Sequence, residues 1–428
     1  MPLNRILLGV MKKIHRLFAG VLALAAALGL TFGMPFIASA EETELESSSV
    51  SMSFEEVEDA VLSGNLTALS IQENIDMIGE IDYDEIQDQL LSAMNQLADV
   101  QWALSTSNIV ERLFLGITDP QYQLDQVNSQ WNALNDQYEA IKDGSTKKTN
   151  DETQWMLRNT QKQLVMAAES LYVTEKSLEI SHSSLARQEE ALKRTKAEMD
   201  VRYKNGQVSQ LNLAELENGA TQLSSGRSTL EMNMDVLSLQ LKNLIGADLG
   251  AKLILKDPAL PTEEQLSSMD LEKDLKSAMA HSYELYDARK KLSDAEDKLK
   301  EEQNKFDYYE RPDSAVRKQA DHNWNSAQYT YQATERSFEL SFRTLYAKVK
   351  DYAQVYEASK TARDTEKKNL EADRIRYSYG TISQNALRTA EDDLATAEEK
   401  VRSSGFDLAA AYRQYIHAVE DGILNGNN

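Results

Sequence analysis

The chain of 428 residues contains no cysteine, which excludes disulfides, thiolate metal sites and cysteine nucleophiles. It has only 17 glycines and 6 prolines, and this scarcity of turn residues is typical of long helices rather than of several compact domains. Its net charge of −23 excludes nucleic acid as a partner, because so acidic a chain repels another polyanion.

The first 40 residues have the pattern of a secretory signal peptide. A basic head precedes an uncharged run over residues 17–40, which ends in the small residues Ala38, Ser39 and Ala40. Cleavage there removes four basic residues and no acidic one, which lowers the net charge from −23 to −27. We therefore expect an exported, extracytoplasmic protein. An uncleaved membrane anchor is the alternative, because the run approaches the length of a membrane span.

Residues 41–53 are acidic and rich in serine, and the lack of periodicity predicts a disordered tether. A first helical repeat is predicted over residues 54–245, with a long helix over about 151–204 and a turn at 203–210. A linker is predicted over residues 246–262, which hold two glycines and two prolines, and Leu253 to Leu255 could form a short strand in it.

A second helical repeat is predicted over residues 263–424. It consists of one helix over about 263–309, a long helix that ends near Tyr379, a turn at 377–384 and a last helix that ends before Gly422. The first repeat is longer by about 44 residues, which we place around 84–150.

Three tryptophans cluster in the longer first repeat, at Trp102, Trp131 and Trp155. We expect them to pack in the core of an extra helical layer, and a partner site is the alternative.

A nine-residue string returns 174 positions later in the chain: 202–210 (RYKNGQVSQ) matches 376–384 (RYSYGTISQ). Its shared or similar positions are Arg202, Tyr203, Gly206, Val208, Ser209 and Gln210 in the first copy, and Arg376, Tyr377, Gly380, Ile382, Ser383 and Gln384 in the second. After each string, apolar residues recur at alternating steps of three and four, which is coiled-coil spacing. The pattern predicts an all-α fold, a tandem repeat of long antiparallel coiled-coil hairpins.

The two strings are expected to form the turns at the hairpin ends. Gly206 and Gly380 permit the positive φ that a tight helix reversal needs. Val208 and Ile382 are expected to give each turn an exposed apolar contact. The arginines could donate hydrogen bonds to helix-end carbonyls or to a partner. The alternative is that these residues only close the hairpins.

With its doubled turn motif, the chain resembles the TolC-like outer-membrane efflux protein family over roughly residues 54–424. In that family tandem helical repeats are joined by turns of the pattern Arg-Tyr/Phe-x-x-Gly-x-x-Ser/Thr. The resemblance implies that three protomers form a hollow α-helical cylinder. It also implies that the two turns bind the helical hairpin of a membrane-fusion adaptor, which is attached to an ABC-type or similar pump.

The sequence departs from the family pattern in two ways. The family inserts a β-hairpin in each repeat, but residues 301–314 are too short and charged for a transmembrane strand, and residues 109–117 do not alternate. We therefore expect a TolC-like protomer without transmembrane strands and no insertion into an outer membrane. Asn212 and Ala386 stand where many members carry an aspartate, so a carboxylate gate is not expected.

The sequence offers no catalytic chemistry. Its five histidines lack metal-ligand spacing, and no nucleophile elbow, Walker loop or dinucleotide motif occurs. We expect no enzyme, no cofactor and no metal. The predicted function is an exported component of an efflux or secretion assembly that docks an adaptor through its hairpin turns. The alternative is a coiled-coil spacer or scaffold of the cell envelope that transports nothing.

Overall fold

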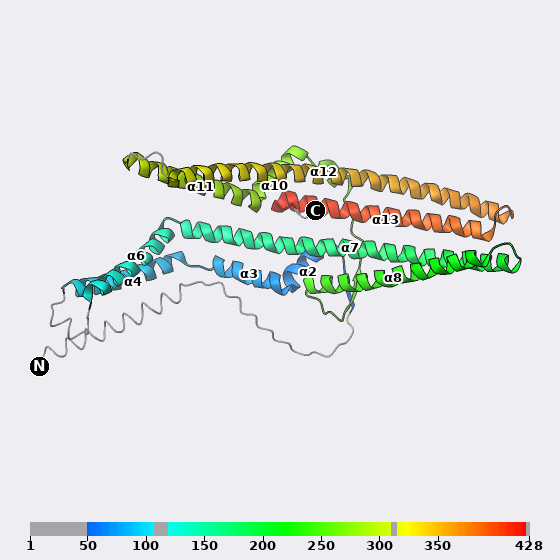
Figure 1. Cartoon of the computed structure of the whole chain (residues 1–428), viewed down its shortest axis with the longest axis horizontal. Coiled ribbons are helices and arrows are strands. Elements are labelled where there is room, and N and C mark those ends of the chain that lie inside the picture. Colours follow the sequence, from blue (N-terminus) through cyan, green and yellow to red (C-terminus); the bar gives the residue numbers. More distant parts are fainter. Residues whose placement is uncertain (1–48, 107–118, 310–314, 425–428) are drawn as a thin grey trace. The chain divides into compact units, whose positions relative to one another are not determined.

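The computed structural model describes residues 49–106, 119–309 and 315–424, and nearly all of them are helical (Figure 1). In chain order the elements are β1 (Ser49–Met52), α2 (Val57–Gly64), α3 (Leu66–Gly79), α4 (Tyr83–Thr106), α6 (Pro120–Lys142), α7 (Ser145–Lys204), α8 (Gln210–Leu244), β2 (Lys252–Leu255), α9 (Glu263–Ser268), α10 (Leu271–His281), α11 (Tyr283–Tyr309), α12 (Ala315–Ser378) and α13 (Gln384–Asp421). The described chain divides into one unit of residues 74–155 and a second unit of residues 49–73 and 156–424.

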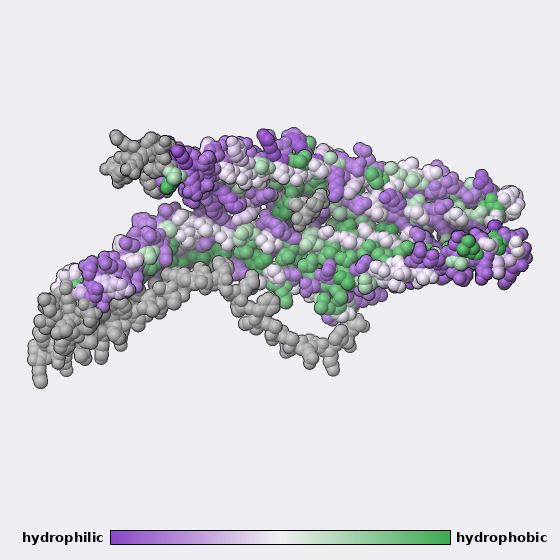
Figure 2. Space-filling model, in the orientation of Figure 1, coloured by the Kyte–Doolittle hydropathy of each residue, from purple (hydrophilic) through white to green (hydrophobic). Residues whose placement is uncertain are grey.

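Apart from residues 145–155 of α7, which belong to the first unit, two long helical hairpins lie in the second unit. They confirm the predicted all-α class of long antiparallel helix pairs. In the first hairpin, α7 with 60 residues is followed by α8 with 35. In the second, α12 with 64 residues is followed by α13 with 38. Figure 1 shows the two helices of each pair side by side. The hairpin ends are mostly hydrophilic with small hydrophobic spots, whereas hydrophobic residues gather around the middle of the view (Figure 2).

The other ends of the hairpins, which we call their roots, surround two hydrophobic cores in the second unit. The core of the first root contains residues of α2, α7, α8 and both strands, among them Val57, Val61, Val165, Tyr172 and Leu241. The core of the second root contains residues of α10, α12 and α13, among them Ala278, Phe338, Phe342, Val349 and Tyr415. Nearly complete burial of these side chains stabilises the roots, because burying one large apolar side chain contributes about 1.5–3 kcal/mol.

The strands β1 and β2 pair in parallel, with Ser49 opposite Lys252 and Met52 opposite Leu255. The tether predicted over residues 41–53 is therefore wrong for residues 49–52, and residues 41–48 lie outside the described residues. The short strand expected at Leu253 to Leu255 is confirmed. The hydroxyl of Tyr172 holds the pair in place, because it donates to the carbonyl oxygens of Met52 or Lys256 at 3.0 and 2.7 Å.

The single helix predicted over 263–309 is instead three helices, α9, α10 and α11. Asp270 starts the second of them, because its carboxylate accepts the backbone N–H groups of Glu272 and Lys273 and so caps α10. The second break, at Ser282, lies where the backbone of Gly422 comes so close that a Cβ on that glycine would be 2.3 Å from the Ser282 nitrogen. Long-range contact thus interrupts a segment with continuous helical periodicity.

The first unit contains most of the extra residues predicted around 84–150. Helices α4 and α6 pack against each other through Leu97, Val100, Leu104 and Val127. Trp131 packs on this core, as expected, but Trp102 is 70% exposed, so the core prediction is wrong for that residue.

Some predictions fall on residues outside the described ranges. These are the signal peptide over 1–40, the segment 109–117 and the end of the segment 301–314. No helix within the described residues has the length and apolar character needed to cross a membrane.

Candidate functional site: the two hairpin tips

The first tip, residues 202–210, reverses the chain with its backbone hydrogen bonds satisfied. Gly206 has a φ of 69°, its N–H donates to the carbonyl of Tyr203 at 2.9 Å, and the N–H of Gln207 donates to the carbonyl of Arg202 at 2.8 Å. This pair of bonds is a Schellman motif, which satisfies the last carbonyls of α7. Ser209 then caps α8 in a capping box with Asn212.

The second tip, residues 376–384, repeats this geometry. Gly380 has a φ of 71°, and its N–H donates to the carbonyl of Tyr377 at 2.9 Å. The N–H of Thr381 donates to the carbonyl of Arg376 at 3.0 Å. Ser383 caps α13 by accepting the N–H of Ala386 at 3.1 Å. The two strings in the sequence therefore form the same backbone turn twice.

Large apolar side chains are exposed at both tips, but they are not the ones expected. We predicted that Val208 and Ile382 are exposed, but both side chains are half-buried. The exposed positions flank the turn glycine and include matched residues 174 apart: Val201, Tyr203 and Leu211 at the first tip, and Ile375, Tyr377 and Tyr379 at the second. Tyr379 is 80% exposed. The sequence held a signal for the missed residues, because Val201 and Ile375 extend the matched string by one apolar position.

The tip arginines pair with carboxylates on their own helices. Arg202 contacts Glu198 at 2.5 Å, and Arg376 contacts Asp373 at 3.0 Å. One of our expectations was that these arginines donate to helix-end carbonyls. They donate to carboxylates instead. Both arginine side chains are more than half exposed, and Gln210 and Gln384 are exposed as well. These groups are available to a partner.

The positions that the family resemblance singles out hold no carboxylate. Asn212 accepts the N–H of Ser209 at 3.1 Å, and Ala386 donates its N–H to Ser383. Both residues therefore serve to start their helices.

Polar contacts join α7 of the first hairpin to α13 of the second. Arg187 forms a two-pronged ion pair with Glu399, and Arg194 pairs with Asp392. Nearer the tips, the amide of Asn385 donates to Glu198 at 3.0 Å. The two tips are thus connected through charged and polar side chains.

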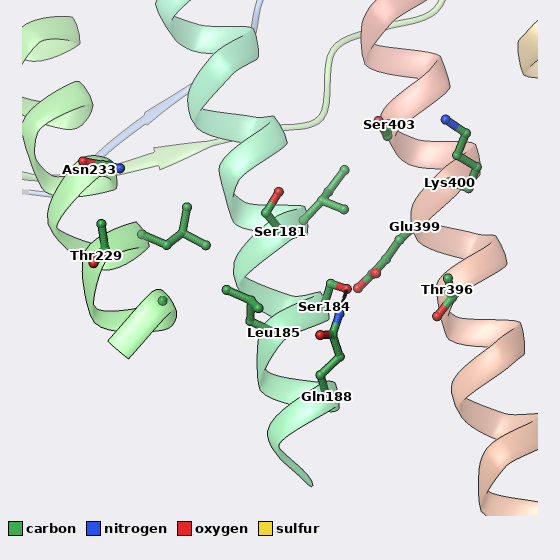
Figure 3. Close-up of a pocket in the computed structure, with 13 residues that line it drawn as sticks. Ser181, Ser184, Leu185, Gln188, Thr229, Asn233, Thr396, Glu399, Lys400 and Ser403 are labelled. Carbon is green, nitrogen blue, oxygen red and sulfur yellow. Dashed lines mark hydrogen bonds between the residues drawn. The ribbon is translucent and has the colours of Figure 1, made fainter. Parts of the chain in front are cut away.

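A groove of about 610 Å³ opens between α7, α8 and α13 (Figure 3). Its walls carry hydroxyl and amide side chains such as Ser181, Thr229 and Asn233, and Gln188 donates a hydrogen bond to Ser184 at 3.3 Å. Glu399, which pairs with Arg187, forms part of its α13 side. Helix α7 therefore contacts both neighbours, and the groove lies along that contact.

Comparison with known proteins finds similarity in structure. No model of a protein family matches the chain. No curated protein sequence matches it either.

Within the described residues, no group of three or more His, Asp or Glu side chains could hold a metal ion.

Three similar solved structures are bacterial membrane proteins. The CmeC outer membrane channel of Campylobacter jejuni is 12% identical, with 93% of this chain and 95% of that chain covered and a TM-score of 0.49. The outer membrane protein VceC of Vibrio cholerae is 12% identical, with 86% and 96% covered and a TM-score of 0.48. The MtrE outer membrane channel of Neisseria gonorrhoeae is 13% identical, with 86% and 89% covered and a TM-score of 0.44. Each of these alignments covers most of this chain.

Proposed function

We propose that the protein is an exported component of an efflux or secretion assembly and that its two tips dock a membrane-fusion adaptor. In this proposal the tip residues Arg202, Tyr203, Gly206, Arg376, Tyr377 and Gly380 contact a helical hairpin of the adaptor, which links the protein to an ABC-type or similar pump. Assembly as a homotrimer belongs to the same proposal.

The observation that carries the proposal is the exposure of matched apolar side chains at both tips. The turns close with their own backbone hydrogen bonds, so the exposed Tyr203 and Tyr377 are not needed to satisfy the backbone. Aromatic residues are enriched in protein interfaces, where a ring contributes contact area and a hydroxyl contributes a hydrogen bond. Two equal tips, each with an exposed tyrosine one turn from its glycine, suit a partner that presents equivalent helices.

The tips differ in charge from the chain as a whole. Residues 202–210 carry two basic side chains and no acidic one, and residues 376–384 carry one basic side chain and no acidic one. The tips are therefore slightly basic, whereas the chain as a whole carries a charge of −23. A partner can approach them without a compensating basic surface, and the arginines offer donors for its carboxylates or carbonyls.

In-cell photo-crosslinking tests the docking. A photoreactive amino acid replaces Tyr203 in one variant, Tyr377 in a second and Leu340 in a control, because Leu340 is an exposed apolar residue of α12 outside the tips. We expect the tip variants to crosslink to hairpin peptides of an adaptor, identified by mass spectrometry, and the control not to do so. Adaptor crosslinks of equal yield from all three positions, or none from the tips, would reject tip docking.

Oligomeric state separates the assembly from the alternative of a non-transporting spacer. We expect mass photometry of the purified protein to show trimers. A strict monomer at micromolar concentration, together with the absence of adaptor crosslinks, would favour a spacer or scaffold of the cell envelope.

A further inference from the structure

Six charged side chains form a closed ring at the hairpin roots, with basic and acidic groups in alternation. They belong to α2, α7 and α13, and in ring order they are His417, Glu169, Arg413, Glu58, Lys162 and Asp421. Each nitrogen lies 2.5 to 3.5 Å from the oxygen of the next group. The ring therefore connects α2 and α7 to α13.

The geometry of His417 requires a charged imidazolium. Its Nε2 lies 3.0 Å from a carboxylate oxygen of Glu169, and its Nδ1 lies 3.2 Å from one of Asp421. A neutral imidazole carries one N–H, so its other nitrogen would face an acceptor without a proton between them. His417 is 2% exposed, and a hydrogen bond left unmade in a buried place is destabilising. With both nitrogens protonated, three positive groups balance three negative ones.

We propose that this ring is a proton-dependent clasp, which holds α13 against α2 and α7 while His417 is protonated and loosens when His417 loses its proton. Arg413 and Lys162 stay charged at physiological pH, since the pKa of each is raised, and the pKa values of Glu58 and Asp421 are lowered. His417 is thus the ring member whose charge changes near neutral pH.

The pKa shifts agree with this assignment. Burial by itself lowers the pKa of His417, but the hydrogen bonds to Asp421 and Glu169 outweigh burial and raise it above 6.5. A raised pKa in the folded state means that the contribution of His417 to stability is fully present below pH 6.5. That contribution is lost as the pH rises through the raised value. The pKa of Asp421 is lowered instead, so its contribution is lost only in acid.

Other charged groups near α13 contact different atoms. On α10, Asp274 accepts from the hydroxyl of Tyr415, and the ring of His281 lies 3.1 Å from the carbonyl oxygen of Val419. Glu420 is exposed on α13 next to the ring residue Asp421. The alternating ring therefore accounts for the groups that face His417 from α2, α7 and α13.

The clasp has no counterpart in the first hairpin. The residues 174 positions before Arg413, His417 and Asp421 are Leu239, Asn243 and Ala247, which are all uncharged. The ring thus belongs to the connection between the hairpins and not to the shared plan of each hairpin. A change of pH should act on that connection and leave the tip turns intact.

Hydrogen–deuterium exchange at the imidazole C2 position, read by peptide mass spectrometry, measures the titration midpoint of each histidine in the full chain. We expect the midpoint of His417 to lie above 6.5 and above its value in urea. Asp421→Asn should move it down, because the Nδ1 partner loses its charge. Glu420→Gln makes the same charge change at an exposed neighbour and should leave it in place. A midpoint of folded His417 at or below its value in urea would overturn the clasp.

Backbone amide exchange tests whether the proton acts as a switch. From pH 6 to pH 8, after correction for intrinsic rates, we expect protection to fall in α2 and at the end of α13, and the apparent Tm to fall by a few degrees. The tip amides should not change. In His417→Gln these pH differences should shrink, whereas His322→Gln, at an exposed position of α12, should behave as the wild type. Equal loss of protection at tips and roots, or pH-independent protection in the wild type, would reject the proposal even if His417→Gln does not fold.

Discussion

At matched positions the two hairpins hold their helices together by different means. In the first, His182 pairs with Glu231 across α7 and α8 at 3.0 Å, and Lys196 pairs with Glu217 at 2.9 Å. The residues 174 positions later are Tyr356 with Gly405 and Leu370 with Glu391. A Cβ on Gly405 would lie 3.5 Å from the ring of Tyr356, and Leu370 is 4% exposed. Polar pairs in the first hairpin thus stand where the second has a close approach of glycine to tyrosine and a buried leucine.

The difference shows what the shaft of a hairpin requires, by which we mean the two paired helices between root and tip. Only Leu241 is buried in α8, whereas nine residues are buried in α13. Exposed ion pairs contribute about 0–1 kcal/mol each, less than a buried leucine. Both hairpins nevertheless have the same turn geometry. A shaft can therefore be held together by polar pairs or by buried apolar side chains. Because α8 has fewer buried residues, we expect it to unfold locally more readily than α13.

The largest expected effect distinguishes the root of the first hairpin from its tip. Gly246 follows α8 with a φ of 68°, and a Cβ there would lie 1.9 Å from the carbonyl oxygen of Gly64. We expect Gly246→Ala to cost about 3 kcal/mol or more, because backbone strain and a backbone clash add. Gly206→Ala should cost only about 1–2 kcal/mol, since nothing lies within 4 Å of its added Cβ. Urea unfolding followed by circular dichroism compares them, and equal losses would disprove the close approach at the root.

Truncation to alanine at one pair of matched positions, Leu370 and Lys196, should give the next largest effect. We expect Leu370→Ala to lower the free energy of unfolding by about 2–3 kcal/mol, because it leaves a cavity in the second shaft. Lys196→Ala, in the first shaft, should cost less than about 1 kcal/mol. Leu340→Ala is the control, because that leucine is 68% exposed. If Lys196→Ala cost as much as Leu370→Ala, the two shafts would not differ as described.

The caps of the returning helices sharpen the comparison further. Ser209→Ala and Ser383→Ala should each cost about 1 kcal/mol, read from thermal unfolding and from amide exchange in the first turns of α8 and α13. Ser209 has a reciprocal partner in Asn212, whereas Ser383 faces Ala386. Ala386→Asn should therefore stabilise α13 by a few tenths of a kcal/mol. A loss of stability would show that an asparagine at this position does not complete the cap as Asn212 does.

The smallest effect is a response to salt. Raising NaCl to about 1 M shortens the Debye length to about 3 Å and weakens exposed ion pairs. Amide exchange should then accelerate in residues 210–235 of α8, whose cross-helix pairs include Lys196 with Glu217 and Arg227 with Glu189. It should change less in residues 355–376 of α12, where the pair of Lys360 with Glu357 lies within one helix. Equal acceleration would mean that ion pairs do not distinguish the shafts.

Local signals predicted the hairpins and their turns well. A glycine followed three residues later by a serine cap predicts a turn because both act on their own backbone, as Gly206 and Ser209 do. The exposure of Val208 was predicted wrongly, because periodicity along the chain does not specify how far a side chain in a tight turn is buried. The break at Ser282 was missed for a related reason, since it depends on Gly422.

By itself, the sequence determined the all-α class, the long helices and the place of both turns, because helix periodicity, glycine conformation and capping are properties of nearby residues. Only the tertiary structure decided the parallel pairing of β1 with β2, the exposure of Trp102 and the charged ring around His417. In that ring Glu58 contacts Arg413, 355 positions away. Such contacts depend on how distant segments pack, and the spacing of residues along the chain carries no record of that packing.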